Sequence, residues 1–277
     1  MKYFYISKID NSIMIYVILW RCDMLLDRYI DELDDMKKYP KELSYIGDLG
    51  LLDRVKVSIV GSRKPSQYTK HLTRQLAQKL SSVGVCVVSG AAMGVDALAH
   101  LGAGASDTIA ILPSGIDIRY PAVNRELIAD IEQYGLTLSQ FDDGFRATPW
   151  SFVMRNEVVV ALGSVLIVTE ADRDSGSMRS VEYAQKMGRE IFVLPHRLGE
   201  SMGTLDLVAD GLATPIYDID EFVSKFGEAA KVVNSPFLQF CSNNPTFDET
   251  VEMFGSIVYE AELDGSIRVE NGLVRLG

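Results

Sequence analysis

Residues 57–66 read Val-Ser-Ile-Val-Gly-Ser-Arg-Lys-Pro-Ser, and this stretch decides the fold. An apolar run ends at Gly61, and a helical pattern follows from Gln67 to Leu80. The same unit recurs at Val85–Val88, before Ser89-Gly90, and at Thr108–Leu112, before Pro113-Ser114-Gly115. Further apolar runs lie at residues 136–138, 165–168 and 191–194, and a last one at 215–217 precedes a helical pattern at 220–226. Short apolar strands alternating with helices indicate a parallel sheet covered on both faces. We therefore predict a doubly wound α/β fold with a mostly parallel sheet.

The pattern also predicts how the chain is divided. We expect a short N-terminal extension at 1–50, the α/β domain at 51–228, a linker at 229–235 and a small module at 236–277. In that module, 237–241 and 246–254 are typical of short helices, and 266–269 and 273–276 of a hairpin that turns at Asn271-Gly272. Helices followed by a hairpin favour a winged-helix-like module.

The composition places the chain in a reducing cytoplasm without a membrane span. Its three cysteines are far apart in the 277 residues and show no metal-ligand spacing, so we expect no disulfide and no metal. The apolar run Ile13–Trp20 is too short to cross a bilayer. Two interpretations of residues 1–23 stay open: an upstream extension that is not translated, or an added strand or helix.

The distribution of charge matters more than the formal net charge of −11. Seven cations lie between residues 54 and 79, and no acidic residue follows them before Asp96. They are Arg54, Lys56, Arg63, Lys64, Lys70, Arg74 and Lys79. A solvated helix face would explain such a stretch, but its position around a strand-to-helix turn favours contact with a polyanion. From Val232 onward the net charge is −5, which argues against duplex DNA binding by the small module.

Three turns rich in small residues follow predicted strands. The first is Gly61-Ser62-Arg63-Lys64, the second begins with Ser89-Gly90, and the third contains Ser175-Gly176-Ser177. Ligands bind at the carboxyl edge of an open parallel sheet, and a helix N-terminus beside such a turn offers free N–H groups to an anion. These turns predict a phosphate-binding trough, although each alone is also typical of a tight βα connection.

Other motifs are weaker or absent. The chain has no dinucleotide fingerprint, phosphate-loop lysine motif or nucleophile elbow. Asp96 and His100 have a spacing of four, which fits a metal pair but more often reflects a polar pair in a core. Arg155-Asn156 follows the aromatic residue Phe152, a combination that suits single-stranded bases and phosphates, while Phe152 is equally typical of a core.

Taken together, the motifs resemble those of the DprA/Smf family of DNA-processing proteins. The resemblance runs over about residues 57–211 and rests on Ile59–Pro65, Val87–Gly90, Gly94-Val-Asp96-Ala97 with Ala99-His100, Tyr120-Pro121 with Asn124, Arg155-Asn156, Val168–Ala171, Ser175–Ser177 and Gly188-Arg189 with Ile191–Pro195. It implies a Rossmann-like domain that dimerises, coats single-stranded DNA during natural transformation and helps to load a RecA-type recombinase, without catalysis or a cofactor. The roughly fifty residues before Leu51 are too few for the sterile-alpha-motif-like domain that many members carry.

The resemblance also implies which residues bind DNA. Gly61, Ser62 and Arg63 match the phosphate-contacting turn, Lys64 is the adjacent base, and Phe152, Arg155 and Asn156 match a base-stacking and phosphate-binding set. Met93 departs from the basic residue that is usual after the second strand. Two alternatives remain: a nucleotide phosphoribohydrolase of the lysine-decarboxylase-like type, with Glu182 as its acid, or a non-catalytic nucleotide sensor.

Overall fold

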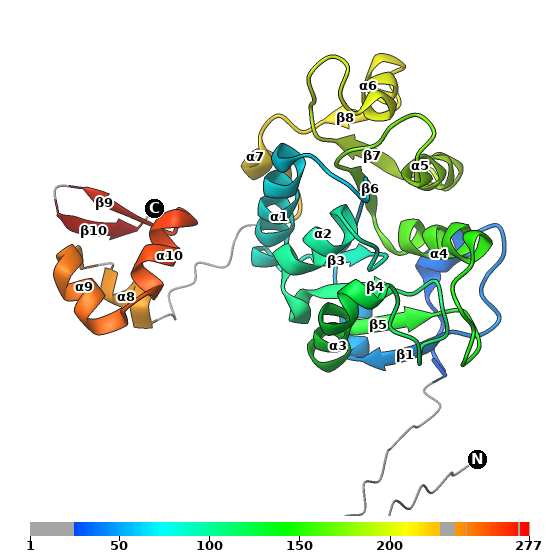
Figure 1. Ribbon diagram of the computed structural model, residues 1–277, viewed down its shortest axis with the longest axis horizontal. Coiled ribbons are helices and arrows are strands. Elements are labelled where there is room, and N and C mark those ends of the chain that lie inside the picture. Colours follow the sequence, from blue (N-terminus) through cyan, green and yellow to red (C-terminus); the bar gives the residue numbers. More distant parts are fainter. Residues whose placement is uncertain (1–24, 228–235, 242, 271, 277) are drawn as a thin grey trace, which may run out of the picture. The chain divides into compact units, whose positions relative to one another are not determined.

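The computed structural model describes residues 25–227, 236–241, 243–270 and 272–276. The chain forms a larger compact unit that ends at Gly227 and a smaller one made of the residues that follow (Figure 1). The predicted linker at 229–235 and the residues 1–23 lie outside the described ranges. No helix in these ranges is long and apolar enough to cross a bilayer.

An eight-stranded sheet organises the larger unit. Its strands are β1 (Ser44–Gly47), β2 (Lys56–Val60), β3 (Cys86–Ser89), β4 (Thr108–Ile111), β5 (Leu136–Ser139), β6 (Val165–Val168), β7 (Glu190–Val193) and β8 (Thr214–Pro215). They lie in the order β1-β5-β4-β3-β2-β6-β7-β8. All neighbours are parallel except β1 and β5. The predicted mostly parallel α/β sheet is confirmed, and its strand order reverses between β2 and β6.

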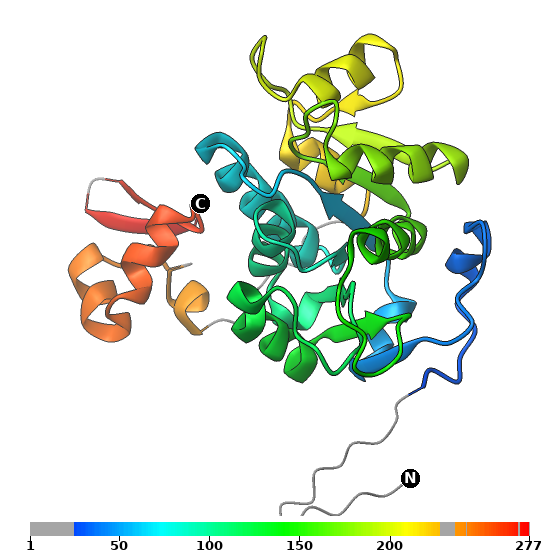
Figure 2. The same cartoon turned by 45° about the vertical axis from the view of Figure 1, so that its right-hand side comes forward.

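Helices cover both faces of this sheet (Figures 1 and 2). One face carries α1 (Gln67–Ser82), α2 (Val95–Ala103), α3 (Arg125–Tyr134) and α7 (Ile219–Ser224), and the other α4 (Pro149–Leu162), α5 (Gly176–Lys186) and α6 (Met202–Ala209). Short 3₁₀ helices lie at Asp31–Asp35, Leu49–Asp53, Ala105–Asp107 and Ala122–Asn124. Successive side chains of a strand alternate between the faces, so Val87 packs on the α1 side and Val88 on the α4 side. This two-sided burial explains the continuous apolar runs in the sequence.

Within the N-terminal extension predicted at 1–50, the described residues 25–50 contribute to the core of the larger unit. Leu33 and Leu43 are buried, and β1 pairs with β5 so that Tyr45 lies opposite Leu138. A four-residue edge strand that is partly exposed carries no strong hydrophobic pattern, which is why β1 escaped prediction.

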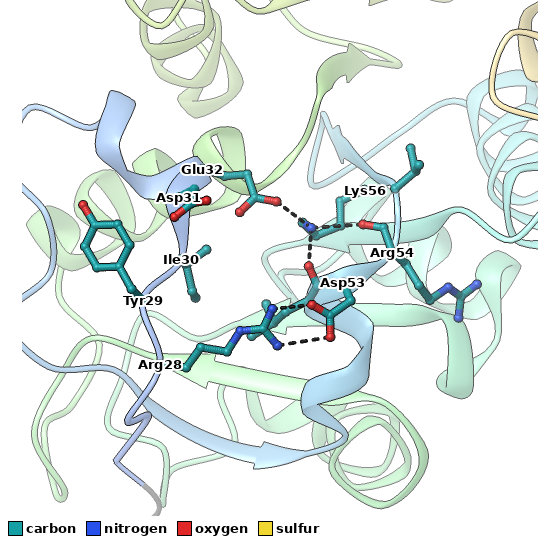
Figure 3. A pocket seen from close by; sticks show the side chains of 10 residues that line it. Arg28, Tyr29, Ile30, Asp31, Glu32, Asp53, Arg54 and Lys56 are labelled. Atoms are coloured by element: carbon teal, nitrogen blue, oxygen red, sulfur yellow. Dashed lines mark hydrogen bonds and ion pairs between the residues drawn. The ribbon is translucent and has the colours of Figure 1, made fainter.

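A buried lysine joins this segment to the sheet, at the edge opposite the turns that follow the strands. The Lys56 ammonium donates to the carbonyl oxygens of Leu52 (2.6 Å) and Arg54 (3.0 Å), and its ion pair with Glu32 spans 2.7 Å. Arg28 and Asp53 form a second ion pair beside it (Figure 3). These groups line a cavity of about 450 Å³ in which the cations are neutralised by neighbouring carboxylates or carbonyl groups.

The described residues of the smaller unit form three helices and a hairpin. They are α8 (Pro236–Cys241), α9 (Phe247–Phe254), α10 (Ile257–Leu263), β9 (Ile267–Glu270) and β10 (Leu273–Leu276), the two strands being antiparallel. Phe237, Val258, Ile267 and Val274 are among its buried core residues. The order resembles a winged helix, and α10 is an addition to the two helices predicted from the sequence. Asn271, in the predicted turn, lies outside the described residues.

We predict that Lys56→Met lowers the free energy of unfolding by about 1–3 kcal/mol, because two carbonyl groups and Glu32 lose a buried donor. Glu32→Gln should cost less, since the amide oxygen still accepts a hydrogen bond. Urea unfolding measures both variants, with the exposed Lys186→Met on α5 as the control. If Lys56→Met unfolds like this control, the buried lysine does not stabilise the fold.

Candidate nucleic-acid interface

The turn after β2 lies where the strand order reverses. The N–H of Ser62 donates to the carbonyl oxygen of Glu170, in the turn after β6, over 2.8 Å. A Cβ on Gly61 would lie 2.8 Å from Val95 Cγ2 and 3.0 Å from the Glu170 carbonyl oxygen, so only glycine fits there without a shift. This edge of an open α/β sheet is where such folds bind ligands.

The turn after β3 supports the Ser62-Arg63 backbone from its other side. Gly94 has a φ of +82°, and a Cβ on it would lie 2.4 Å from the Ser62 carbonyl oxygen. The same oxygen accepts the N–H of Val95 over 3.0 Å. The backbone of residues 61–63 is therefore fixed between two loops, while the side chains of Arg63 and Lys64 are exposed.

An aromatic ring from α4 positions Arg63. The Arg63 guanidinium lies 5.0 Å from the centre of the Phe152 ring, and that of Arg155 lies 5.7 Å from it. Tyr120 contacts the same ring edge-on, with 5.9 Å between ring centres. Such contacts hold a guanidinium over a ring without neutralising its charge. The Phe152 side chain is half-buried, so it is only partly packed in the core and only part of its ring could stack on a base.

Arg155 is buried, which corrects the expectation that it contacts phosphate directly. It is 3% exposed, and its guanidinium donates to the carbonyl oxygens of Gly90 and, over 3.0 Å, Ile111. Burial lowers the pKa of Arg155 to about 10, although Asp96, 4.0 Å away, opposes this. A Cβ on Gly90 would lie 1.6 Å from Arg155 Nη1. Arg155 therefore joins the ends of β3 and β4 to α4 and supports Phe152.

A buried histidine holds the loop that follows β3. Ala91 N–H donates to His100 Nε2 over 3.2 Å, and His100 Nδ1 contacts Thr108 Oγ1 at 2.7 Å. Because the Thr108 hydroxyl donates to the Val87 carbonyl oxygen, Nδ1 carries the proton and the ring is neutral. Burial, with a smaller effect of Arg155, lowers the pKa of His100 to about 3.

Two further side chains complete this network. Asn124 donates from Nδ2 to the carbonyl oxygens of Ala91 (2.9 Å) and Ala92 (3.0 Å), and Asp96 accepts the Ala92 N–H over 3.4 Å. Asp96 and His100 thus bind loop backbone, and the described ranges contain no group of three or more metal-ligating side chains. Their spacing in the sequence was a signal of this polar core pair.

The N-terminus of α1 is already occupied by a carboxylate. Glu170 Oε2 accepts the Ser66 N–H over 3.0 Å and the Thr69 hydroxyl over 2.6 Å. Burial opposes ionisation, but these hydrogen bonds outweigh it and hold the pKa of Glu170 below its ordinary value. The expected anion site at this helix end is therefore taken by the protein itself, and an anion would contact the Arg63 side chain instead.

The remaining predicted residues lie in other surroundings. Ser89 is buried and donates to the Ile59 carbonyl oxygen over 2.7 Å, so its hydroxyl faces the sheet. Asn156 is half-buried next to Arg155. Gly176 is exposed, Ser177 is 8% exposed, and the Ser175 hydroxyl is buried without a partner among the described residues. Ala171, which precedes this turn, donates its N–H to the Ser201 hydroxyl and accepts the N–H of Gly203 in α6.

The basic stretch is less uncompensated than its sequence suggests. Arg54 pairs with Asp107 (2.7 Å), Lys56 with Glu32 and Lys79 with Asp220 (2.5 Å), all with acids distant in sequence. In the described part of the chain, four of the seven cations have no ion-pair partner: Arg63, Lys64, Lys70 and Arg74. The free charges are thus confined to the turn after β2 and to α1.

Comparison with known proteins gives a consistent match. The family model for DNA recombination-mediator protein A matches residues 23–227. The solved structure of DNA processing protein A from Helicobacter pylori, described for its single-stranded-DNA binding mode, is 41% identical with a TM-score of 0.71, covering 73% of this chain and 94% of that one. DprA from Streptococcus pneumoniae is 31% identical with a TM-score of 0.67, covering 72% and 71%.

The match to curated relatives is partial in length. Protein Smf from Synechocystis is 36% identical over 159 residues, which are 56% of this chain and 40% of that protein. The chain therefore spans less than half the length of this relative.

We predict that His100→Gln removes part of the loss of stability on acidification. The unfolded chain protonates His100 near pH 6.5, whereas the folded chain keeps it neutral down to about pH 3, so stability present above pH 6.5 is lost as the pH falls below that value. From pH 7 to 5 this loss is about 2 kcal/mol in the parent. Urea unfolding at both pH values measures it. Burial raises the pKa of Asp96, which acts in the opposite direction in both proteins. An equal pH dependence of parent and variant would contradict the prediction.

Proposed function

We propose that this chain, which belongs to the DNA recombination-mediator protein A family, binds single-stranded DNA without sequence preference and acts as a mediator rather than an enzyme. The observation that carries the proposal is the exposed Arg63, fixed by its backbone and by Phe152 at the strand-order reversal. The DNA-binding mode described for the Helicobacter pylori protein supports it.

The chemistry of this surface favours a phosphate backbone. Arg63 offers a planar fork of donors that matches phosphate oxygens, and Lys64, Lys70 and Arg74 add charges without an ion-pair partner among the described residues. Contacts to phosphates and sugars carry no sequence information, which accounts for binding without sequence preference. Phe152 and Tyr120 place aromatic surface beside these cations, as proteins that bind single strands require.

Membership of the family supports a proposal about the partners. We propose a homodimer in the cytoplasm that protects incoming single strands during natural transformation and helps to load a RecA-type recombinase. The smaller unit, whose net charge from Val232 onward is −5, is better suited to contact protein than DNA.

The binding proposal is preferred over the phosphoribohydrolase alternative. Glu182, its proposed acid, is exposed on α5 and pairs with Arg179 at 3.0 Å. Glu170, at the turn itself, already accepts hydrogen bonds from the start of α1. A general acid needs a raised pKa, whereas the hydrogen bonds to Glu170 lower the pKa of that carboxylate.

We predict that Arg63→Ala weakens binding of a labelled oligothymidylate about ten- to a hundredfold, because a guanidinium–phosphate bond is lost. The slope of log affinity against log salt should become shallower by about 0.7. Arg63→Lys should restore only part of the affinity, since it keeps the charge but not the fork. Fluorescence anisotropy at several salt concentrations measures all three proteins.

The melting temperature separates this role from a structural one. Arg63→Ala should melt near the parent, because the Arg63 side chain is exposed and has no hydrogen bond or ion pair within the described residues. Lys186→Ala removes one exposed charge from α5 and serves as the matched control. An Arg63→Ala protein that melts normally and binds like the parent would remove Arg63 from the interface.

Deleting Pro236–Gly277 should leave the affinity for single-stranded DNA within about threefold of the full chain, because Arg63, Lys64, Lys70 and Arg74 lie in the larger unit and the deleted part is acidic. The same anisotropy titration measures it. Loss of most of the affinity would place DNA contacts in the smaller unit.

A further inference from the structure

Three aromatic rings gather where the loop after β5 leads into α4. Phe141 and Phe145 are stacked, with 4.9 Å between ring centres, and Trp150 contacts each of them edge-on with 5.6 Å between centres. Phe141 is buried and Phe145 is half-buried, whereas Trp150 is 55% exposed. The two phenyl rings therefore support an indole that stays largely open to solvent.

The backbone around these rings is held at both ends of the loop. The N–H of Gly115, after β4, donates to the Phe145 carbonyl oxygen over 2.9 Å. At the start of α4, the side chains of Thr148 and Ser151 cap the helix reciprocally. Trp150 lies inside this capped turn, so a ligand that stacks on it meets an indole on fixed backbone and pays little for ordering it.

The rings continue the proposed DNA interface along the carboxyl edge of the sheet. Trp150 and Phe152 belong to the same first turn of α4, and the Arg63 guanidinium lies over the Phe152 ring. Trp150 is not among the residues that line the cavity of about 470 Å³ between α1 and α2, which Arg63 borders. A strand that leaves Arg63 past Phe152 therefore meets the indole outside that cavity.

The charges around the rings favour a base over a phosphate at this point. Asp142 and Asp143 are exposed carboxylates on the same loop. Arg146 is exposed and has no ion-pair partner in the described part of the chain, so it offers one cation beside two carboxylates. These charges do not make an anion site, whereas an aromatic surface binds every base through its π face.

An exposed indole beside cations that bind phosphate is suited to stacking. We propose that Trp150 is a stacking platform for a base of the bound single strand, and that it extends the interface from Arg63 toward the loop after β5. This inference rests on the proposed function. Exposed tryptophans also occur at protein contacts, and that occupant is a contrary outcome of the test.

Two substitutions separate stacking from packing. Trp150→Leu keeps apolar volume over the phenyl rings but removes the flat π surface, and Trp150→Phe keeps a ring. We expect Trp150→Leu to weaken binding of oligothymidylate about five- to fiftyfold, and Trp150→Phe to stay within about threefold of the parent. An abasic oligomer of equal length should bind both variants like the parent, because its phosphates still contact Arg63. Fluorescence anisotropy measures these affinities, with Lys186→Ala as the control.

Tryptophan emission reports the contact even if Trp150→Leu does not fold. Trp20 is the other tryptophan of the sequence, so Trp20→Phe leaves Trp150 as the single emitter. We expect saturating oligothymidylate to quench this emission and the abasic oligomer to leave it unchanged. Thymidine monophosphate at equal nucleotide concentration should not quench it, because a free nucleotide is not held by further phosphate contacts along a strand.

The outcomes distinguish the stacking platform from the DNA-binding proposal. If Trp150→Leu binds oligothymidylate like the parent while Arg63→Ala does not, the platform is wrong and the proposed function stands. If neither change affects binding, both are wrong. Unquenched emission with saturating oligothymidylate, or equal quenching by thymidine monophosphate, also overturns the platform. A Trp150→Leu protein that binds both oligomers like the parent but sediments in a different oligomeric state assigns the rings to a protein contact instead.

Discussion

The buried guanidinium of Arg155 is the interaction on which the candidate interface depends. It donates hydrogen bonds to the carbonyl oxygens of Gly90, which follows β3, and of Ile111, at the end of β4. These bonds join the two parallel strands to α4, the helix that carries Phe152. Phe152 in turn holds Arg63 over its ring. Burying an arginine is costly unless carbonyl groups or carboxylates compensate it, so this arrangement requires the whole edge of the sheet to be in place. The exposed guanidinium of Arg63 is therefore positioned, through Phe152, by the buried guanidinium of Arg155.

The strands and helices could be predicted because two-sided burial leaves short apolar runs, such as 57–60 and 165–168. The edge strand at 44–47 could not, since it is half-exposed and antiparallel. The turn containing Arg63 was found from its glycine and its position after a strand. The burial of Arg155 was not, because its acceptors lie 65 and 44 residues away in the sequence. The spacing of residues in the sequence predicts local geometry, but it does not identify hydrogen-bond partners that are so far apart in the chain.

The ion pairs of the basic stretch also depend on partners that are distant in the sequence. The basic stretch at 54–79 is continuous in sequence, but Asp107, Glu32 and Asp220 neutralise three of its members at other edges of the fold. The cations of this stretch that keep no ion-pair partner among the described residues lie on the turn after β2 and on α1. The Glu170 carboxylate also accepts hydrogen bonds at the start of α1, so this helix N-terminus is not free to bind another anion. The fold thus narrows a broad positive segment to a few side chains around a cavity between α1 and α2.

The contact between Gly90 and Arg155 also restricts how the sequence can change over time. Any side chain at position 90 would overlap the guanidinium, with its Cβ 1.6 Å from Nη1. A substitution of Gly90 is therefore accessible only after Arg155 has been replaced or displaced. Replacing Arg155 first leaves the Gly90 and Ile111 carbonyl groups without their donor. Either single substitution therefore disturbs this contact, so the two positions constrain each other although they are 65 residues apart in the chain.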